Sequence, residues 1–296
     1  MPGELGIGSS RTERAWRVDP LAPWLIPFSG ARVACSSMKI AARGQTDVGC
    51  KRDHNEDSFL VDEDLGLFVV ADGMGGHAGG GTASRLAVET IQAQFRVACD
   101  EDALLLSRPA ALEESPVREI LRGAVESACL KIYEAAQGDP SLAGMGTTVT
   151  AAVFSGHNAF IAHVGDSRCY LARKGNIYQV SEDHSLVNEQ LKAGAITLDE
   201  ARNSRFKNII TRSVGFEADV VVDMMGLEVE PDDRLVLCCD GLSNLVDDQE
   251  ILDIVSKLSV DDAPKELISI ANERGGDDNI TVIVIRVSPA DAQASE

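Results

Sequence analysis

Long apolar runs and paired cysteine motifs are both missing from this sequence. Its longest apolar stretches, such as Ile280 to Val287, have the length of a strand, whereas a membrane-spanning helix needs about 20 apolar residues. The seven cysteines include no C-x-x-C pair, which argues against both a disulfide framework and a zinc knuckle. We therefore expect no membrane span, reduced thiols and a cytoplasmic location.

Basic residues are scarce relative to acidic ones. The chain has 27 Lys and Arg against 47 Asp and Glu, a formal net charge of −20. Such a chain repels a nucleic-acid backbone and an anionic membrane surface, so neither is an expected partner. The surplus carboxylates could instead hold divalent cations, which prefer oxygen ligands. An apolar fraction of 44% is enough for a substantial core and excludes a disordered chain.

Two hydrolase signatures are also missing. The five histidines form no H-E-x-x-H pair, and no serine lies in a G-x-S-x-G elbow. A zinc peptidase and a serine hydrolase of that type are therefore disfavoured.

Residues 1–37 differ from the rest of the chain. They contain both tryptophans and four prolines but no apolar periodicity, and we expect a disordered N-terminal extension. Regular patterns begin at Met38, which predicts one domain over residues 38–288 and a short C-terminal tail over 289–296.

Strand-like and helix-like segments occur in blocks rather than in strict alternation. Apolar runs predict strands at Phe59–Asp62, Leu67–Ala71, Thr148–Phe154, Ala159–Val164, Arg234–Cys239 and Ile280–Val287. Amphipathic patterns predict helices at about Gly80–Val97, after Ser115 and Pro116, at Asp247–Leu258 and at Ala263–Glu273. Ser115 suits an N-cap and Pro116 the first helical position. The block arrangement favours an α+β fold with antiparallel sheets.

Several predicted strands run directly into an aspartate. Asp72, Asp166 and Asp240 each follow an apolar run, and Asp278 comes shortly before another. A single Asp-Gly after a strand is usually a hairpin turn. Four such strand ends could instead bring their carboxylates into one cleft, where like charges about 4 Å apart repel by roughly 4 kcal/mol. Divalent ions would neutralise that repulsion, and oxygen ligands favour Mg²⁺ or Mn²⁺.

Arg52 precedes further acidic residues in the segment R-D-H-N-E-D. A charge run of this kind is usually a solvated loop. The alternative is that the guanidinium of Arg52 binds a phosphate while the acids beside it hold metal, because guanidinium geometry suits phosphate.

The glycine-rich segment from Gly73 to Gly81 contains G-x-G-x-x-A after a predicted strand and before a predicted helix. That order is also the context of dinucleotide binding. Asp72 would repel a pyrophosphate, however, and the neighbouring segments do not form a βαβ pattern. A nucleotide-dependent oxidoreductase is therefore the weaker interpretation.

Together these motifs resemble the metal-dependent serine/threonine protein phosphatases of the type 2C, or PPM, group. The resemblance spans Lys39 to Val287, and the D-G-M-G-G-H-A-G-G form is similar to the bacterial branch. The matching segments are Arg52–Ser58, Asp72–Gly76, Gly144–Thr148, Gly165–Arg168, Asp183–Ser185, Thr211–Arg212 with Gly215, Cys239–Leu242 and Gly276–Thr281.

The resemblance implies a four-layer αββα sandwich, in which two antiparallel sheets are flanked by pairs of helices, with two metal ions at one end. It implies that Asp72 bridges two Mn²⁺ or Mg²⁺ ions, that Asp240 and Asp278 complete one site, and that Glu56 and the Gly73 carbonyl complete the other. A third, weaker ion would use Asp166 with Asp240. Arg52 would bind the substrate phosphate, Asp57 would hydrogen-bond the water that the ions activate, and Asn279 would steady the site from its rim.

The resemblance further implies hydrolysis of phosphoserine and phosphothreonine in proteins, opposing a Hanks-type kinase, by a monomeric enzyme. Animal relatives carry His after the D-G pair, where this chain has Met74. The general acid is therefore open, with His77 as one candidate. The stretch from Lys192 to Arg212 resembles a mobile flap, where Ala193, Ile196 and Arg202 would shape substrate choice. A binding domain that kept the fold without activity is the remaining alternative, and the intact acidic set argues against it.

Overall fold

The computed structural model describes residues 38–75, 79–107, 112–202 and 204–289. The predicted N-terminal extension, residues 1–37, lies outside these ranges, as does nearly all of the predicted tail. Within them, no helix combines the length and apolar character that crossing a membrane requires.

The described strands form two antiparallel sheets. They are β1 (Met38–Asp47), β2 (Asp57–Asp62), β3 (Leu67–Met74), β4 (Gly146–Thr147), β5 (Val149–Ser155), β6 (Asn158–Val164), β7 (Arg168–Arg173), β8 (Asn176–Gln179), β9 (Asp223–Glu228), β10 (Arg234–Cys238) and β11 (Ile280–Pro289). The first sheet has the order β1-β11-β10-β7-β8 and the second the order β2-β3-β5-β6-β9, with β4 paired to β3. Because β3 pairs antiparallel with both β2 and β5, the glycine-rich segment after it does not belong to a βαβ unit.

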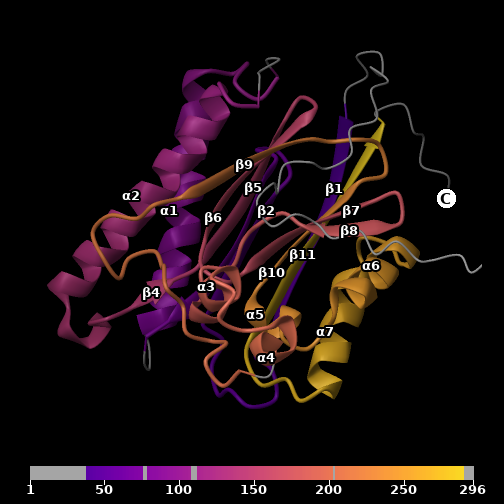
Figure 1. Ribbon diagram of the computed structural model, residues 1–296. Helices are drawn as coiled ribbons and strands as arrows, with labels where there is room; N and C mark the ends of the chain where they lie inside the picture. Colours follow the sequence, from indigo (N-terminus) through magenta and orange to yellow (C-terminus); the bar gives the residue numbers. More distant parts are fainter. Residues whose placement is uncertain (1–37, 76–78, 108–111, 203, 290–296) are drawn as a thin grey trace, which may run out of the picture. The chain divides into compact units, whose positions relative to one another are not determined.

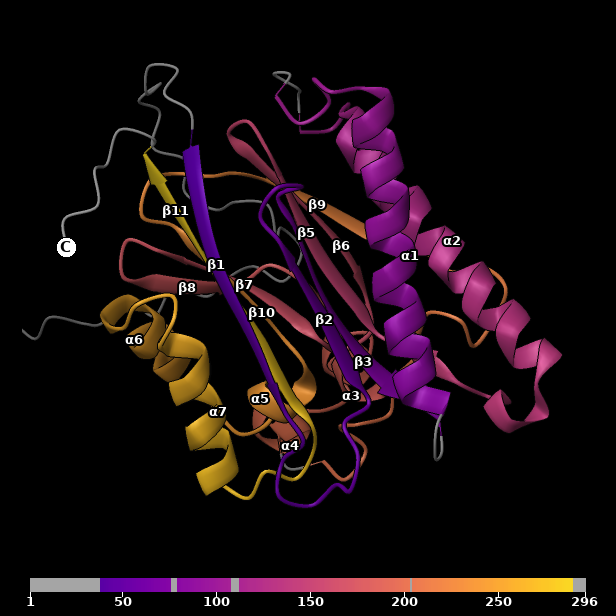
Figure 2. The same ribbon diagram turned by 180° about the vertical axis from the view of Figure 1, so that it is seen from behind.

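Helices cover the outer face of each sheet. The described helices are α1 (Gly79–Glu101), α2 (Pro116–Gly138), α3 (Leu186–Lys192), α4 (Leu198–Arg202), α5 (Asp240–Ser243), α6 (Asp248–Lys257) and α7 (Ala263–Glu273), and four of them form the outer layers. Helices α1 and α2 pack on the sheet that contains β3 and β6, whereas α6 and α7 pack on the sheet that contains β8 and β11. Figures 1 and 2 show these pairs on opposite sides of the two sheets. The predicted four-layer α+β sandwich is confirmed.

Side chains alternate between two cores along the central strands. On β3, Leu67 and Val69 pack with α1 and α2, so Phe68 and Val70, which are also fully buried, face the other sheet. On β11, Val282 packs against the outer helices. Its neighbour Thr281 therefore faces inward, between the sheets. This alternation decides which residues can meet at the end of the sandwich.

All the predicted strands and helices are present, but the sequence patterns missed several others. Strands β1, β7, β8 and β9 and helices α3 to α5 were not predicted. β1 is an edge strand whose first residues alternate between partly buried and exposed, and β8 is short and half-exposed. Such strands bury too little apolar surface to leave a strong pattern.

Element boundaries also moved. Helix α1 runs four residues beyond the predicted Val97, and β11 continues to Pro289, into the range predicted as tail. Ser115 is the N-cap residue of α2, as predicted, but its side chain makes no capping hydrogen bond.

Candidate active site

The acidic residues that follow or precede strands gather at one end of the sandwich. Asp57 and Asp72 are paired across β2 and β3 in one sheet. Asp240 follows β10 and Asp278 precedes β11, which are neighbours in the other sheet. The charges of Asp57, Asp240, Asp166 and Asp278 all act on the carboxyl group of Asp72. The structure thus brings together carboxylates that the sequence predicted would converge.

Burial and mutual repulsion disfavour the charged form of these carboxyl groups. Burial first, and then the charges of neighbouring aspartates, raise the pKa of Asp72 well above its usual value. The same causes raise the pKa of Asp166 to about 8 and that of Asp240 to about 6. For Asp57, burial outweighs a hydrogen bond from Thr281 and raises the pKa to about 7. Such a cluster calls for protons or cations as counter-charge.

Two oxygens of the cluster have no hydrogen-bond partner among the described residues. They are Oε1 of Glu56 and Oδ1 of Asp57, and both atoms are buried. A buried, unpaired carboxylate oxygen is costly unless a ligand satisfies it. Together with the oxygen-rich donor set, these atoms fit hard divalent cations such as Mg²⁺ or Mn²⁺. The residues that could hold them are Glu56, Asp72, Asp240 and Asp278, with the carbonyl of Gly73.

Asp57 is held in place from the opposite sheet. The hydroxyl of Thr281 donates to Asp57 Oδ2 over 2.6 Å. Thr281 Oγ1 also lies 2.7 Å from Thr46 Oγ1, which accepts a hydrogen bond from Asn55. This chain of side chains fixes the orientation of Asp57, and sequence reasoning did not find it. The available signal was that Thr281 is the one polar residue in the run Ile280–Ile285 and lies inside a matched motif.

Glycines allow the site loops to approach one another closely. A Cβ on Gly73 would collide with the carbonyl oxygens of Gly80 and Glu56, and one on Gly241 would collide with the carbonyl of Asn279. Asp72 and Gly73, at the end of β3, and Asp240 and Gly241, after β10, are therefore more than turns. They bring the backbone at Glu56, at the start of α1 and at Asn279 into direct contact beside the aspartates.

Arg52 lies at the exposed mouth of the cluster. Its Nη2 donates to Oδ2 of Asp278 over 2.7 Å, and 51% of its side chain is exposed. Burial lowers the pKa of Arg52, but the charges of Asp278, Glu56 and Asp72 outweigh it and raise the pKa overall. The guanidinium is thus permanently charged and adjacent to the acids, where it could meet an incoming anion.

Asn279 does not lie at the rim of the site, which corrects the prediction. It is 5% exposed. Its Nδ2 donates to the carbonyls of Val48 and His54, and its Oδ1 accepts from the backbone of Glu56. The amide side chain is fully used in holding the 48–56 loop against β11. Asn279 is therefore a positioning residue beneath the acidic cluster.

The segment around Asp166 connects the cluster to the rest of the fold. Asp166 is 7% exposed. The hydroxyl oxygen of Thr148 accepts a hydrogen bond from the backbone N–H of Asp72 and also forms a hydrogen bond with the hydroxyl of Ser167. Arg168 forms a salt bridge with Asp183, in which Nη2 and Oδ2 are 2.6 Å apart. The G-D-S-R, G-M-G-T-T and D-H-S motifs therefore brace Asp72 and Asp166.

The predicted flap residues are not among the residues that support Asp72 and Asp166. Ala193 is the exposed C-cap of α3, Ile196 follows it, and Arg202 ends α4. Lys207 lies in the segment predicted to be a flap, and its positive charge partly offsets burial and the charge of Asp278, which together raise the pKa of Asp240. A polar cavity of about 250 Å³ lies between α3 and the residues near Arg212. His77, the candidate general acid, lies outside the described residues.

Comparison with known proteins identifies the family to which the chain belongs. The family model of protein phosphatase 2C matches residues 50–280. The serine/threonine phosphatase stp of Listeria welshimeri is 38% identical over 248 residues, covering 82% of this chain and 94% of that protein. The serine/threonine phosphatase PstP/Ppp of Mycobacterium tuberculosis has a TM-score of 0.75 at 32% identity, covering 84% of this chain and 99% of that one.

A PstP catalytic domain solved with two manganese ions has a TM-score of 0.74 at 33% identity, and the match covers 85% of this chain and 100% of that one. The chain belongs to the protein phosphatase 2C family. The predicted family is therefore confirmed.

Proposed function

We propose that this protein hydrolyses phosphoserine and phosphothreonine in proteins, with the acidic cluster holding two divalent ions. The observation that carries the proposal is the group of Asp57, Asp72, Asp240 and Asp278, drawn from both sheets and flanked by Arg52. The named activity of the stp and PstP relatives and the manganese ions of the PstP domain support it.

Each ion has its own set of residues in this proposal. Asp240 and Asp278 would hold one ion, Glu56 and the Gly73 carbonyl would hold the other, and Asp72 would contribute to both. When bound, two such ions supply Lewis-acid charge and lower the pKa of water enough to make a nucleophile near neutral pH. The unpaired oxygens of Glu56 and Asp57 support this assignment.

The side chains of the protein then position the reactants. Arg52 receives the phosphate of the substrate, because a planar guanidinium can donate two parallel hydrogen bonds to it. Asp57, fixed by Thr281, accepts a proton from the attacking water and aligns it with phosphorus. Met74 cannot donate a proton to the leaving serine or threonine oxygen, so His77 stays a predicted donor.

Further expectations extend this proposal. Asp166, with Asp240, would hold a third, weaker ion. The substrates would be targets of a Hanks-type kinase, with Ala193, Ile196 and Arg202 influencing which ones are accepted. The enzyme would act as a monomer in the cytoplasm, which the free thiols of the described cysteines support.

A phosphothreonine peptide tests the proposal. We expect phosphate release in Mn²⁺ and none after chelation. The Asp240→Asn variant should lose activity by about a hundredfold or more. The substitution weakens the binding of an ion that would stabilise the transition state by several kcal/mol. Asp253→Asn, which changes an exposed acid on α6, is the matched control and should keep full activity. Turnover that persists in chelator, or an active Asp240→Asn, would overturn the proposal.

A further inference from the structure

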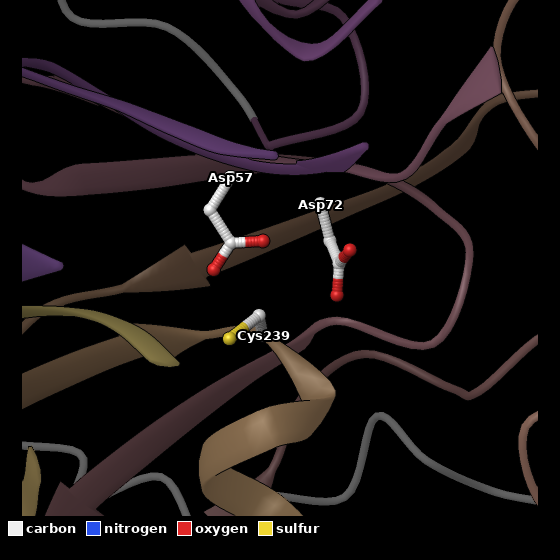
Figure 3. Close-up of side chains that lie close together, drawn as sticks. All are labelled: Asp57, Asp72 and Cys239. Atoms are coloured by element: carbon white, nitrogen blue, oxygen red, sulfur yellow. The ribbon is translucent and has the colours of Figure 1, made fainter. Parts of the chain in front are cut away.

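A thiol lies directly under the acidic cluster. Cys239 immediately precedes Asp240 and is fully buried, while its neighbour Cys238 packs on the other face of the sheet with α6 and α7. Donor atoms of Cys239, Asp57 and Asp72 all lie within 4.8 Å of one another. Figure 3 shows both carboxyl groups directed toward the space above the sulfur. Neither the proposed ion pair nor the phosphate site uses this sulfur.

A second observation points to a ligand at this place. Oδ1 of Asp57 is buried and unpaired among the described residues, although the other oxygen of the same carboxyl group is bonded to Thr281. The backbone N–H of Thr281 donates to Sγ of Cys239 over 3.0 Å. An N–H donor of this kind stabilises a metal-bound thiolate and fixes its direction. The thiol itself donates to the carbonyl of Asn279 over 3.3 Å, a bond that a metal would replace when it displaces the thiol proton. Oδ1 of Asp57 is therefore the atom that lacks a partner within the described chain, and the sulfur beside it is already oriented by Thr281.

The geometry points to a mixed sulfur and oxygen site, formed by Cys239, Asp57 and Asp72, that binds a thiophilic divalent cation such as Zn²⁺ or Cd²⁺. On binding, the sulfur–metal bond forms as the thiol proton leaves to solvent, and the two carboxylates supply the remaining negative charge. Zinc takes sulfur at about 2.3 Å and carboxylate oxygen at about 2.1 Å, so side-chain movements of about 1 Å suffice.

Chemistry separates this ion from the proposed catalytic ions. Mg²⁺ and Mn²⁺ prefer oxygen ligands, whereas a thiolate selects zinc and softer metals. Asp72 would be a ligand both in this site and in the proposed catalytic site, so a thiophilic ion would displace one of the catalytic ions. Inhibition by such an ion is the only part of this inference that rests on the proposed function. The site itself stands independently of any phosphatase activity.

Cobalt provides an optical test that needs no turnover. Co²⁺ is added under reducing, anaerobic conditions to the full-length, metal-stripped protein. Coordination by thiolate gives a charge-transfer band in the near ultraviolet, whereas oxygen ligands alone do not. We expect the band in the wild type and in Cys50→Ser, which removes an exposed thiol, and we expect its loss in Cys239→Ser.

Zinc affinity gives a quantitative check on the same proteins. Competition with a chromophoric chelator should show zinc binding weakened on the order of 10- to 100-fold or more in Cys239→Ser. Affinity for Mn²⁺, measured in parallel, should change far less. Equal losses for both metals would indicate general damage to the site and would count against a sulfur ligand.

X-ray absorption at the zinc edge keeps the test independent of any variant at Cys239. Zinc-loaded protein carrying only Cys50→Ser should show a sulfur shell at about 2.3 Å. A spectrum with oxygen and nitrogen neighbours alone, or a cobalt band that persists in Cys239→Ser, would overturn the inference. If turnover fails while the sulfur shell is present, the proposed function fails and this site stands.

Discussion

Nη2 of Arg52 lies 2.7 Å from Oδ2 of Asp278, so the side chain assigned to phosphate binding contacts one assigned to metal binding. The pair joins the 48–56 loop to the start of β11 at the mouth of the site. An anion that reaches Arg52 therefore arrives beside the carboxylates that would carry the cations.

Replacing Arg52 tests its role in binding the substrate. Arg52→Ala should lower kcat/KM for a phosphopeptide by about 10²–10³, the cost of removing a charged donor from a reaction centre. Mn²⁺ binding should survive, because Arg52 is not a ligand. The control is Arg43→Ala, a similarly exposed arginine paired with Asp261 at 3.9 Å, which should leave kinetics unchanged. Wild-type kinetics in Arg52→Ala would contradict the assignment.

Thr281 is predicted to act through Asp57. Thr281→Val keeps the shape but removes the donor to Asp57, so kcat should fall by about tenfold, with little change in KM, because losing the orientation of Asp57 removes only part of the roughly 10²–10⁴-fold that a general base contributes. Denaturant unfolding should show a stability loss of about 1–2 kcal/mol for the unpaired groups. Thr281→Ser should restore kcat.

A buried hydroxyl elsewhere serves as the control for Thr281. Thr150 is fully buried and bonded to His163, away from Asp57. Thr150→Val should lose similar stability while keeping kcat. An equal loss of kcat in both valine variants would show that Thr281 is only structural.

The paired histidines predict a loss of stability in mild acid. His163 and His184 stack with ring centroids 4.9 Å apart. Nε2 of His163 donates to the carbonyl of Glu182, and its Nδ1 lies 3.0 Å from the hydroxyl oxygen of Thr150, which also donates to the carbonyl of Ser167. Burial, followed by the charge of His184, lowers the pKa of His163 from 6.5 to about 4.

The direction of the change in stability with pH follows from the lowered pKa of His163. The unfolded chain takes up a proton on His163 below pH 6.5, whereas the folded protein does so only near pH 4. The contribution of His163 to stability is therefore complete above the first value and falls as the pH drops toward the second, by up to about 3 kcal/mol. The raised pKa values of Asp57 and Asp240 act in the opposite direction, so the effect of His163 is the difference between the wild type and a variant at this position. Denaturant unfolding across this range should show a shallower slope for His163→Gln than for the wild type or for the control His157→Gln. Identical slopes would contradict this account.

Alanine substitutions at two glycines distinguish a steric effect of close backbone packing from an effect of helix propensity. Gly73→Ala should destabilise the protein by about 1–3 kcal/mol, because the added methyl group meets the carbonyls of Gly80 and Glu56. At Gly123 on α2, an added methyl group would have no neighbouring atom within 4 Å. Gly123→Ala should therefore raise stability by about 0.5–1 kcal/mol. Thermal unfolding of the two variants measures both effects, and equal shifts would contradict the role given to Gly73.

The central strands and the acidic residues at their ends could be predicted because both leave local patterns. A fully buried strand such as β3 is a continuous apolar run, and Asp72 lies near its end. Edge strands β1 and β9 bury less apolar surface, so their patterns are weak. The fold class followed from the order of strong segments, and the four layers followed from the family resemblance.

The parts of the site that were missed depend on contacts across the fold. Whether Asn279 lies at the rim or beneath the cluster depends on the path of the 48–56 loop, which pairs with it from more than 200 positions away. The link from Thr281 to Asp57 joins two sheets. The position of Cys239 beside Asp57 and Asp72 also appears only when the sheet that contains β10 packs against the sheet that contains β2 and β3. None of these contacts has a signature in a short segment of sequence.

The most direct test of the account is anomalous diffraction from crystals of the protein loaded with Mn²⁺. The account predicts two adjacent peaks, one contacted by Asp72, Asp240 and Asp278 and the other by Glu56, Asp72 and the carbonyl of Gly73. Manganese bound elsewhere, with no peak among these carboxylates, would contradict it.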